Sequence, residues 1–343
     1  MNPGLAVKLR PTGPWRIGPD SGARNQVDEI YHSDSLYSAV TSALNRLGLL
    51  DEWLAATARN GASAVCFSSC FPFVDEIGYV VPPRTIWPPS SPALMAAHVR
   101  WKSARFVPLG IVQALLAGQS LDENEWAVDG PSGCLLPAGR PGPWRTGVRF
   151  SAALDRLTGT SERHSTACIE FRPGAGLWAV VSFADDAARS RWIDPLKTAF
   201  RWLADSGFGG ERSRGWGRSE EPEFTEGTLP EMILVPATAG LPKEEVTVAS
   251  SQPQWLLSLF SPAAADSVDW DRGNYAVLER CGRVESPVRW GELKKHVNMI
   301  SEGSVLYAAS PLRGGAPDVA PDGFAHPVFR AGFAVAIPLP EVS

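Results

Sequence analysis

Residues 207–218 read Gly207-Phe208-Gly209-Gly210-Glu211-Arg212-Ser213-Arg214-Gly215-Trp216-Gly217-Arg218. The stretch holds five glycines and three arginines. Glycine lets backbone N–H groups approach a ligand closely, and successive free N–H groups form a concave nest for phosphate oxygens. Arginine adds forked donors that match phosphate geometry, and a tryptophan offers a flat face on which a base can stack. This combination indicates a loop that binds a nucleic-acid backbone.

The simpler interpretation is a flexible surface loop, although Gly/Ser linkers seldom carry three arginines. The stretch is not a P-loop, because no Gly-Lys-Ser/Thr follows the glycines, and it is not a dinucleotide fingerprint, because its glycines follow a predicted helix rather than open one. The residues that we expect to contact RNA in this loop are Gly207, Gly209, Gly210, Arg212, Ser213, Arg214 and Trp216.

The charges of the chain are segregated. With 343 residues two domains are expected, and a net charge of −5 argues against a protein that coats nucleic acid non-specifically. Residues 140–149 nevertheless carry three arginines and no acid, which permits a local basic channel. Residues 220–231 carry five glutamates and no base, and they are either a solvated linker or a surface that faces a basic partner.

The cysteines and the N-terminal residues indicate a cytoplasmic protein. The five cysteines are scattered and lack a Cys-x-x-Cys zinc spacing, so we expect free thiols in a reducing cytosol. Neither a signal peptide nor an apolar run long enough for a membrane span is seen. The sequence predicts no metal and no cofactor.

Hydrophobic periodicity gives the first two-thirds of the chain an alternating order of strands and helices. The predicted elements are a strand at 5–10, a helix capped by Ser33 or Asp34 that ends at Gly48, a second helix at 51–59, a buried strand at 64–74 that breaks at Pro72, a long hairpin from Thr146 with its polar tip at 159–165, a strand at 177–183, a helix opened by Asp194-Pro195, and a strand at 218–224. Without its insertions this order is β-α-β-β-α-β, the ferredoxin-like order. The segment 121–143 is not assigned.

The last third of the chain predicts a second, smaller and more β-rich domain, with a short helix near Lys294-Lys295-His296. The fold class is therefore α+β, with two ferredoxin-like (RRM-like) domains, a glycine-rich loop and an inserted β-hairpin. The predicted boundaries are residues 1–228 for the first domain, 229–250 for a linker and 251–343 for the second domain.

Further candidate contacts lie outside the glycine-rich loop. His32 and Ser33 stand just before a predicted helix N-terminus, a place where anions bind. His32 is thus an RNA contact, the general base of a ribonuclease, or a histidine that packs the loop. Arg149 and Arg156 could follow an RNA backbone from the hairpin. Lys294 and Lys295 could contribute from the second domain, which would place the groove between the domains.

Four stretches together resemble one known family. They are the glycine-rich loop at 207–218, His32-Ser33-Asp34-Ser35-Leu36-Tyr37-Ser38-Ala39 at a helix start, Phe67-Ser68-Ser69-Cys70-Phe71-Pro72-Phe73 leading to Val81-Pro82-Pro83, and Ala153-Leu154-Asp155-Arg156-Leu157-Thr158-Gly159 in the hairpin. The chain resembles the RAMP superfamily of CRISPR-associated RNA-binding proteins, and within it subunit four of the type III-A (Csm) effector complex.

The resemblance implies a non-catalytic cap that holds the repeat-derived 5′ handle of the guide RNA (crRNA). It also implies contact with the large polymerase-type subunit and with a backbone RAMP subunit, only indirect contact with target RNA, and a thumb-like hairpin that points toward the guide.

Two other functions remain open from the residues. The first is a metal-independent endoribonuclease that processes precursor crRNA with His32 as general base, although no second proton-transfer group is clearly paired with it. The second is a small-nucleotide enzyme that uses the glycine loop as a phosphate cradle, although the lysine and the acidic metal ligands of such sites are missing.

Overall fold

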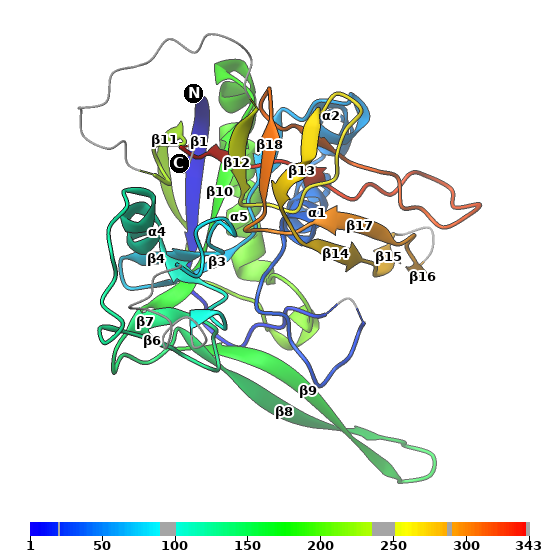
Figure 1. The fold of residues 1–343 in the computed structure, drawn as a ribbon. Coiled ribbons are helices and arrows are strands. Elements are labelled where there is room, and N and C mark those ends of the chain that lie inside the picture. The colour runs from blue at the N-terminus through cyan, green and yellow to red at the C-terminus, as the bar shows by residue number, and fades with distance from the viewer. Residues whose placement is uncertain (20, 90–100, 235–250, 287–289, 341–343) are drawn as a thin grey trace.

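The computed structural model describes residues 1–19, 21–89, 101–234, 251–286 and 290–340. It confirms an α+β protein, in which a larger and a smaller antiparallel sheet stand side by side and a long hairpin extends away from both (Figure 1). In this part of the chain, no helix is long and apolar enough to cross a membrane.

The larger sheet has seven strands within the described residues. They are β1 (Asn2–Leu9), β2 (Val65–Phe67), β3 (Phe71–Val74), β4 (Ile77–Val80), β5 (Val107–Pro108), β10 (Ala175–Phe183) and β11 (Glu223–Leu229). Their order is β11-β1-β10-β3-β4-β5, and β2 also pairs with β10. Strand β1 lies between β11 and β10, and its Leu5, Val7 and Leu9 alternate into the core, as the period of two predicts.

The break in the second predicted strand lies at residues 68–70 and not at Pro72, which is inside β3 opposite Leu177. The backbone N–H groups of residues 69 and 70 have partners outside the sheet ladder. The Ser69 N–H donates to the carbonyl of Leu257, which directly follows the segment Gln252–Leu256 of the second sheet, and the Cys70 N–H donates to the carbonyl of Tyr31. The segment leaves the ladder to make these long-range bonds.

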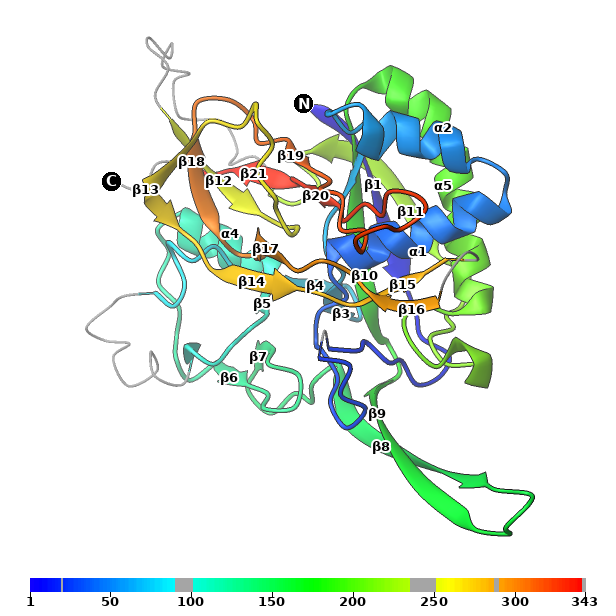
Figure 2. The ribbon, with the colours of Figure 1, turned by 90° about the vertical axis from the view of Figure 1, so that its right-hand side faces the viewer.

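Helices cover one face of the larger sheet (Figure 2). They are α1 (Ser33–Arg46), α2 (Leu50–Leu54), which continues as a π-helical turn (Ala55–Arg59), and α5 (Asp186–Ser206); α4 (Leu109–Leu116) lies beside β4 and β5. Residue 32 caps α1, rather than Ser33 or Asp34, whose side chains have other partners.

Helix α5 begins at Asp186 rather than at Asp194-Pro195. The Asp185 carboxylate accepts a hydrogen bond from the Ala188 N–H at 2.7 Å and so caps the helix earlier. Pro195 lies inside the helix, where it removes one backbone donor. The buried stripe of Trp192, Leu196 and Phe200 offsets this loss.

The hairpin is longer than predicted. Strands β8 (Trp144–Leu154) and β9 (Ser161–Phe171) pair over their full length, so residues 161–165 of the predicted tip are strand and the turn is 155–160. The segment left unassigned contains a small hairpin of β6 (Trp126–Val128) and β7 (Leu135–Pro137).

The smaller sheet has four strands in the described chain: β12 (Gln252–Leu256), β13 (Val268–Asn274), β18 (Val305–Ala308) and β21 (Ala336–Pro338). Their order is β21-β12-β18-β13, so the fourth, first, third and second strands lie side by side. In the larger sheet β11, β1, β10 and β3 have the same order.

Three two-stranded ribbons accompany the smaller sheet. They are β14 (Val277–Arg280) with β17 (Val297–Ile300), β15 (Arg283–Glu285) with β16 (Trp290–Leu293), and β19 (Gly314–Gly315) with β20 (Gly332–Phe333). The prediction of a short helix near Lys294 was wrong, because residues 294–296 connect strand β16, which ends at Leu293, to strand β17, which begins at Val297. The predicted domain boundaries stay a prediction, and residues 235–250 of the predicted linker lie outside the described residues.

A buried cluster of charges joins the two sheets. Asp34 in the first turn of α1 receives two hydrogen bonds from Arg280, at 3.0 and 3.1 Å, and a third from Arg330. All three side chains are buried. Burial alone would raise the pKa of Asp34, but the two guanidinium groups outweigh it and hold that pKa well below its usual range.

We expect Asp34→Asn to lower the free energy of unfolding by about 3–5 kcal/mol, because the amide leaves two buried guanidinium groups without their counter-charge. Urea unfolding monitored by tryptophan fluorescence measures this loss. Glu226→Gln is the matched control, since Glu226 pairs with Arg189 and Lys197 on the surface and should cost less than about 1 kcal/mol. Equal effects of the two variants would contradict the structural role of Asp34.

Candidate nucleic-acid interface

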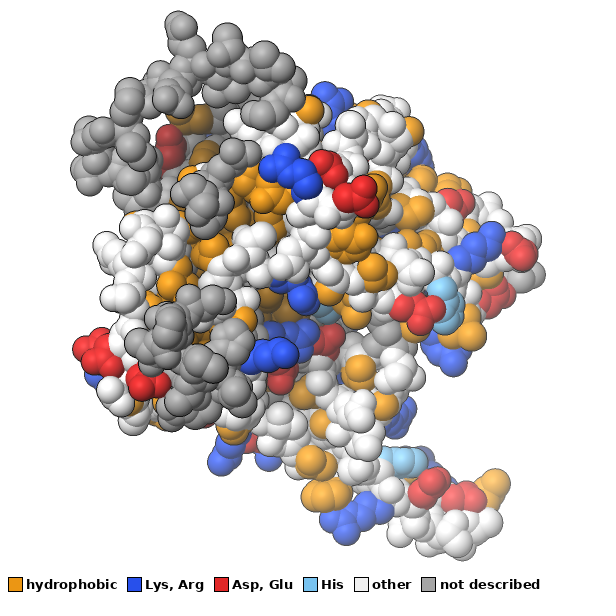
Figure 3. Space-filling view, in the orientation of Figure 1, with side chains coloured by type: hydrophobic (Ala, Val, Ile, Leu, Met, Phe, Trp, Pro, Cys, Tyr) orange, Lys and Arg blue, Asp and Glu red, His pale blue; other side chains and the backbone are white. Residues whose placement is uncertain are grey.

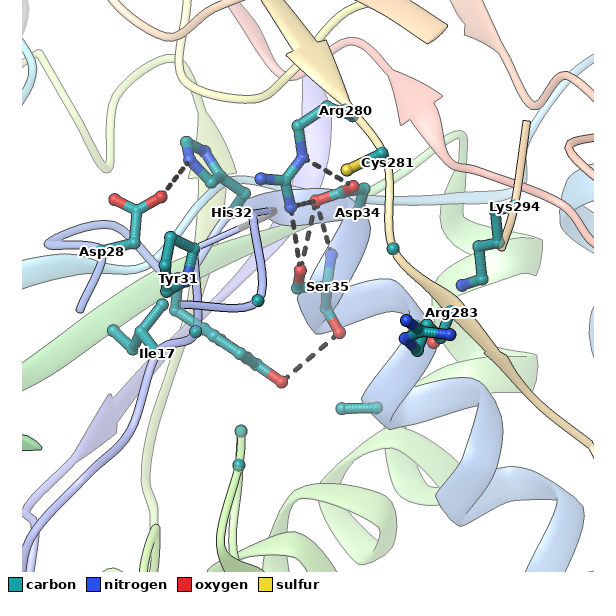
Figure 4. Close-up of a pocket in the computed structure, with 18 of the residues that line it drawn as sticks. Ile17, Asp28, Tyr31, His32, Asp34, Ser35, Arg280, Cys281, Arg283 and Lys294 are labelled. Carbon is teal, nitrogen blue, oxygen red and sulfur yellow. Dashed lines mark hydrogen bonds and ion pairs between the residues drawn. The ribbon is translucent and has the colours of Figure 1, made fainter. Parts of the chain in front are cut away.

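A cleft of about 730 Å³ lies between the N-terminal and C-terminal parts of the chain. Its lining includes residues 17–19, 21 and 22, residues 28 and 30–32 with the first turns of α1, the glycine-rich loop from Gly207 to Arg212, and residues 280–283 with Lys294 and Arg330 (Figure 4). Basic and acidic side chains lie together near the middle of this face of the molecule, and further basic side chains follow the hairpin (Figure 3). The RNA groove between two domains stays a prediction, and this cleft is the cavity that brings together residues from both parts of the chain.

The glycine-rich loop is packed tightly against its own chain. Gly207 has a φ of +97° and ends α5, and Gly217 has a φ of +80°. A Cβ at Gly217 would meet the Phe208 carbonyl oxygen at 2.0 Å, and one at Gly209 would meet the Arg16 carbonyl oxygen at 2.4 Å. Glycine is required here because backbone strands approach each other closely.

Much of the donor capacity of the loop is used within the protein. The N–H groups of Phe208, Gly210 and Gly217 donate to Gly217, Arg16 and Pro14 at 2.9 Å each. An open nest that offers every N–H group to phosphate, as the composition suggests, is thus not what the loop forms. Its basic side chains, rather than its glycines, are the groups that can bind phosphate from the cleft wall.

The predicted loop contacts fall on two sides. Gly207, Gly209, Gly210 and Arg212 line the cleft. Ser213 and Arg214 are exposed on a 3₁₀ turn (Arg212–Arg214) outside the cleft lining, where Arg214 pairs with Glu211 at 3.1 Å. Trp216 has only 9% of its surface exposed, and this leaves little of its ring for a base to stack on.

His32 lines the cleft but is held on both sides. Its Nδ1 lies 2.8 Å from Glu302 and its Nε2 lies 3.3 Å from Asp28, and only 3% of the residue is exposed. Burial disfavours the charged imidazolium, yet the charge of Glu302 and the hydrogen bonds to Asp28 and Glu302 raise the pKa of His32 to about 9. Ser69 also donates to Glu302. A protonated imidazole at neutral pH has no lone pair with which to act as a general base.

Ser33 serves the contact between the sheets. Its hydroxyl accepts a hydrogen bond from the Leu259 N–H at 3.0 Å, and its N–H donates to Ser69 at 2.8 Å. The residue is buried behind the cleft. Ser33 at the helix start therefore binds Ser69, between β2 and β3, and Leu259, in the segment after β12.

The remaining predicted cations are dispersed. Lys294 lines the cleft and faces it beside Arg283 (Figure 4), whereas Lys295 pairs with Asp322 at 2.8 Å and is not part of the lining. Arg149 pairs with Glu170 at 2.5 Å on the hairpin, and Arg156 is exposed in its turn. The structure thus brings together His32, three loop glycines, Arg212 and Lys294, and leaves the hairpin arginines outside.

Sequence reasoning missed the contribution of residues 280–283. Arg280-Cys281-Gly282-Arg283 combines a glycine with two arginines, as the glycine-rich loop does, and this was the available signal. Here Arg280 binds Asp34, and Arg283 lines the cleft opposite α1. Glu302 gave no local signal, because its partner His32 is 270 residues away.

The acidic stretch at 220–231 largely forms ion pairs with arginine and lysine side chains of the same chain. Glu221 pairs with Arg201 at 3.0 Å, Glu223 with Arg10 at 2.6 Å, and Glu226 with Lys197 at 2.7 Å. Most of this stretch belongs to β11, so it is neither a solvated linker nor a purely acidic face.

The raised pKa of His32 predicts that stability falls as pH rises from about 6.5 to about 9. The folded state favours the protonated ring, so its contribution is complete below the ordinary pKa of 6.5 and is lost as pH rises through the folded value of about 9. We expect a loss of about 3 kcal/mol over this window. Urea unfolding at several pH values measures it. His32→Gln should flatten this dependence, and an unchanged slope in the variant would refute the assignment.

Two loop glycines give a matched test of close packing. Gly215 and Gly217 have nearly the same φ, +79° and +80°, but a Cβ at Gly215 meets nothing within 4 Å. Gly215→Ala should cost about 1 kcal/mol from backbone strain alone. Gly217→Ala should cost at least twice that, because it also strikes the Phe208 carbonyl oxygen. Equal melting temperatures of the two variants would show that the loop relaxes freely.

The C-terminal part of the chain matches a known protein family. Residues 249–339 match the family described as "CRISPR Csm4 C-terminal domain". No curated protein matches the sequence.

Solved structures match along the whole chain. One is a chain of a Csm1–Csm4 cassette in complex with cA4, with 18% identity, a TM-score of 0.58 and 99% of both chains covered. Another belongs to a Csm3–Csm4 subcomplex in the type III-A CRISPR-Cas interference complex, with 14% identity, a TM-score of 0.62, and 98% of this chain and 100% of that chain covered. At these identities the likeness concerns the fold. Residues 249–339 are therefore similar to the Csm4 C-terminal domain, and the chain as a whole shares the fold of these solved chains.

Proposed function

We propose that this chain is a non-catalytic, crRNA-binding cap subunit of a type III CRISPR effector complex, which holds the 5′ handle of the guide in the cleft between its two sheets. One observation carries the proposal. The glycine-rich loop meets cations from the second domain across a single cleft, in a chain with a Csm4-like fold.

The cleft offers the chemistry that a single strand of RNA needs. Arg212 on one wall and Arg283 and Lys294 on the other provide positive charge for phosphates. Between them, the exposed side of α1 lines the cleft with Ser35, Ser38 and Ser42, whose hydroxyl groups suit 2′-OH groups and base edges. Since Trp216 is buried, recognition would depend on backbone contacts more than on stacking.

The two sheets support a finer fold assignment. Each places its fourth, first, third and second strands side by side, which fits two ferredoxin-like (RRM-like) domains. In the described residues 251–286 and 290–340 the second unit has ribbons and loops where the first has helices, so it is a reduced version of that fold. Ser213, Arg214, Arg149, Arg156 and Lys295 would contact RNA that continues beyond the cleft.

The partners follow from the complexes that contain the similar chains. Solved chains of this fold come from a Csm1–Csm4 cassette and a Csm3–Csm4 subcomplex. We therefore expect this chain to dock the large polymerase-type subunit and a backbone RAMP subunit, and to meet target RNA only through the assembled complex in the cytoplasm. The endoribonuclease alternative gains no support, because His32 is buried between two carboxylates and protonated at neutral pH.

The proposal predicts that Arg212→Ala with Lys294→Ala weakens binding of a single-stranded RNA that carries the host's repeat-derived 5′ handle. Losing two phosphate contacts should reduce the slope of log K against log salt by about 1.4, at roughly 0.7 per contact for a single strand. Fluorescence anisotropy at several salt concentrations measures this slope, and a denaturing gel shows whether the RNA stays intact.

The matched control is Arg59→Ala with Arg191→Ala. Both arginines are exposed and ion-paired on the helical side, with Asp51 and Glu52. The control should keep the wild-type salt slope. The same loss in both double variants would remove the cleft from the proposal, and cleaved RNA would argue for an enzyme.

A further inference from the structure

A short segment, Pro14–Ile17, lies between the glycine-rich loop and the base of the hairpin. On the hairpin side Trp15 and Ile169 exchange two backbone hydrogen bonds, at 2.7 and 3.0 Å. On the loop side the carbonyl groups of Pro14 and Arg16 accept hydrogen bonds from Gly217 and Gly210, at 2.9 Å each. One stretch of backbone is thus bonded to both structures at once.

The side chain of Arg16 strengthens this junction. It is 7% exposed, and its guanidinium lies within hydrogen-bond distance of four backbone carbonyls, one through Nη2 and three through Nη1, which shares its two hydrogens among them. One acceptor is Ala167 in β9, at 2.9 Å; the others are Ala23 at 2.7 Å and Arg24 and Gln26 at 3.1 Å each. A planar guanidinium fixes its acceptors in one arrangement. The Arg16 side chain therefore connects the hairpin base to the loop at 23–26.

The segment Pro14–Ile17 packs closely against the glycine-rich loop. The Trp15 ring stacks on Phe208 with centroids 5.2 Å apart and an interplanar angle of 18°, and its Nε1 donates to the Arg218 carbonyl at 3.0 Å. Gly209 approaches the Arg16 carbonyl so closely that a Cβ would lie 2.4 Å from it. Packed interiors transmit small shifts rather than absorb them. A displacement of the loop must therefore reach the segment and the hairpin base.

We propose that Arg16 is a positioning residue that couples hairpin β8–β9 to the glycine-rich loop, so that a ligand in the cleft changes the stability of the hairpin base. The coupling depends on contacts within this chain. The proposed function enters only through the identity of the ligand. Because coupling between two sites is reciprocal, a partner that fixes the hairpin should also tighten ligand binding in the cleft.

Hydrogen exchange of the RNA-free protein tests the coupling without any ligand. In Arg16→Gln we expect exchange to become roughly tenfold faster at both ends of the junction, the amides of Gly210 and Gly217 and those of Ala167 and Ile169, since charge-assisted hydrogen bonds are lost. Arg145→Gln is the control, because Arg145 lies on the hairpin with its side chain 80% exposed and pairs with Glu170. It should leave the glycine-rich loop unchanged. Faster exchange at the hairpin base alone, or at the loop alone, would overturn the proposal.

Amides of α5 report whether the variant is folded. If Arg16→Gln loses their protection, Arg16→Lys takes its place, since it keeps the charge but not the planar fork. The lysine variant should change both ends of the junction together and by less. A change at one end only would again reject the coupling.

A second arm adds the 5′-handle RNA. In the wild-type protein the RNA should slow exchange in the glycine-rich loop and at the hairpin base, and in the Arg16 variant it should slow exchange in the loop alone. Protection of the loop without any response of the hairpin base in the wild type would refute the coupling. No protection of the loop would instead refute RNA binding, and the RNA-free arm would still decide whether the coupling exists.

Discussion

The buried contact between Asp34 and two arginines of the C-terminal part of the chain constrains the rest of the structure. A buried carboxylate is tolerated only when its charge is matched and its oxygens are hydrogen-bonded. Arg280 and Arg330 meet both conditions. The first turn of α1 must therefore face residues 280 and 330, and the cleft forms beside this contact (Figure 4). His32 and Glu302 repeat the arrangement with opposite charges, so the two parts of the chain are held by ion pairs in both directions.

This arrangement separates two kinds of basic residue. Arg16, Arg280 and Arg330 are buried and use their donors on carbonyl or carboxylate groups of the chain itself. Arg212, Arg283 and Lys294 instead line the cleft, although Arg283 also donates to the Gly291 carbonyl. The net charge of −5 is consistent with this division, because acids such as Glu223 and Glu226 pair with bases outside the cleft.

Local patterns predicted the larger sheet well and the polar contacts poorly. The alternation of Leu5, Val7 and Leu9 and the helical stripe after Leu36 depend on neighbours in sequence, so their periodicity was readable. The start of α5 was missed because both Asp185 and Asp194 are residues that can cap a helix. In the structure Asp185 is the cap, and Trp192 in the first part of the helix is buried. The roles of His32 and Ser33 depend on Glu302 and Leu259, more than two hundred residues away, and no spacing in the sequence carries that information.

The glycines illustrate why composition alone leaves the mechanism of phosphate binding open. A glycine-rich stretch with arginines fits a phosphate nest, and it equally fits a loop that must pass close to another backbone. The structure favours close passage, because Gly209 and Gly217 lie where a Cβ would strike a carbonyl oxygen. Close passage has a consequence that a nest lacks. A loop pressed against Pro14–Ile17 cannot shift alone, whereas an open nest could close on phosphate without moving its surroundings. The same glycines that bring Arg212 to the cleft wall therefore also tie the cleft to the hairpin.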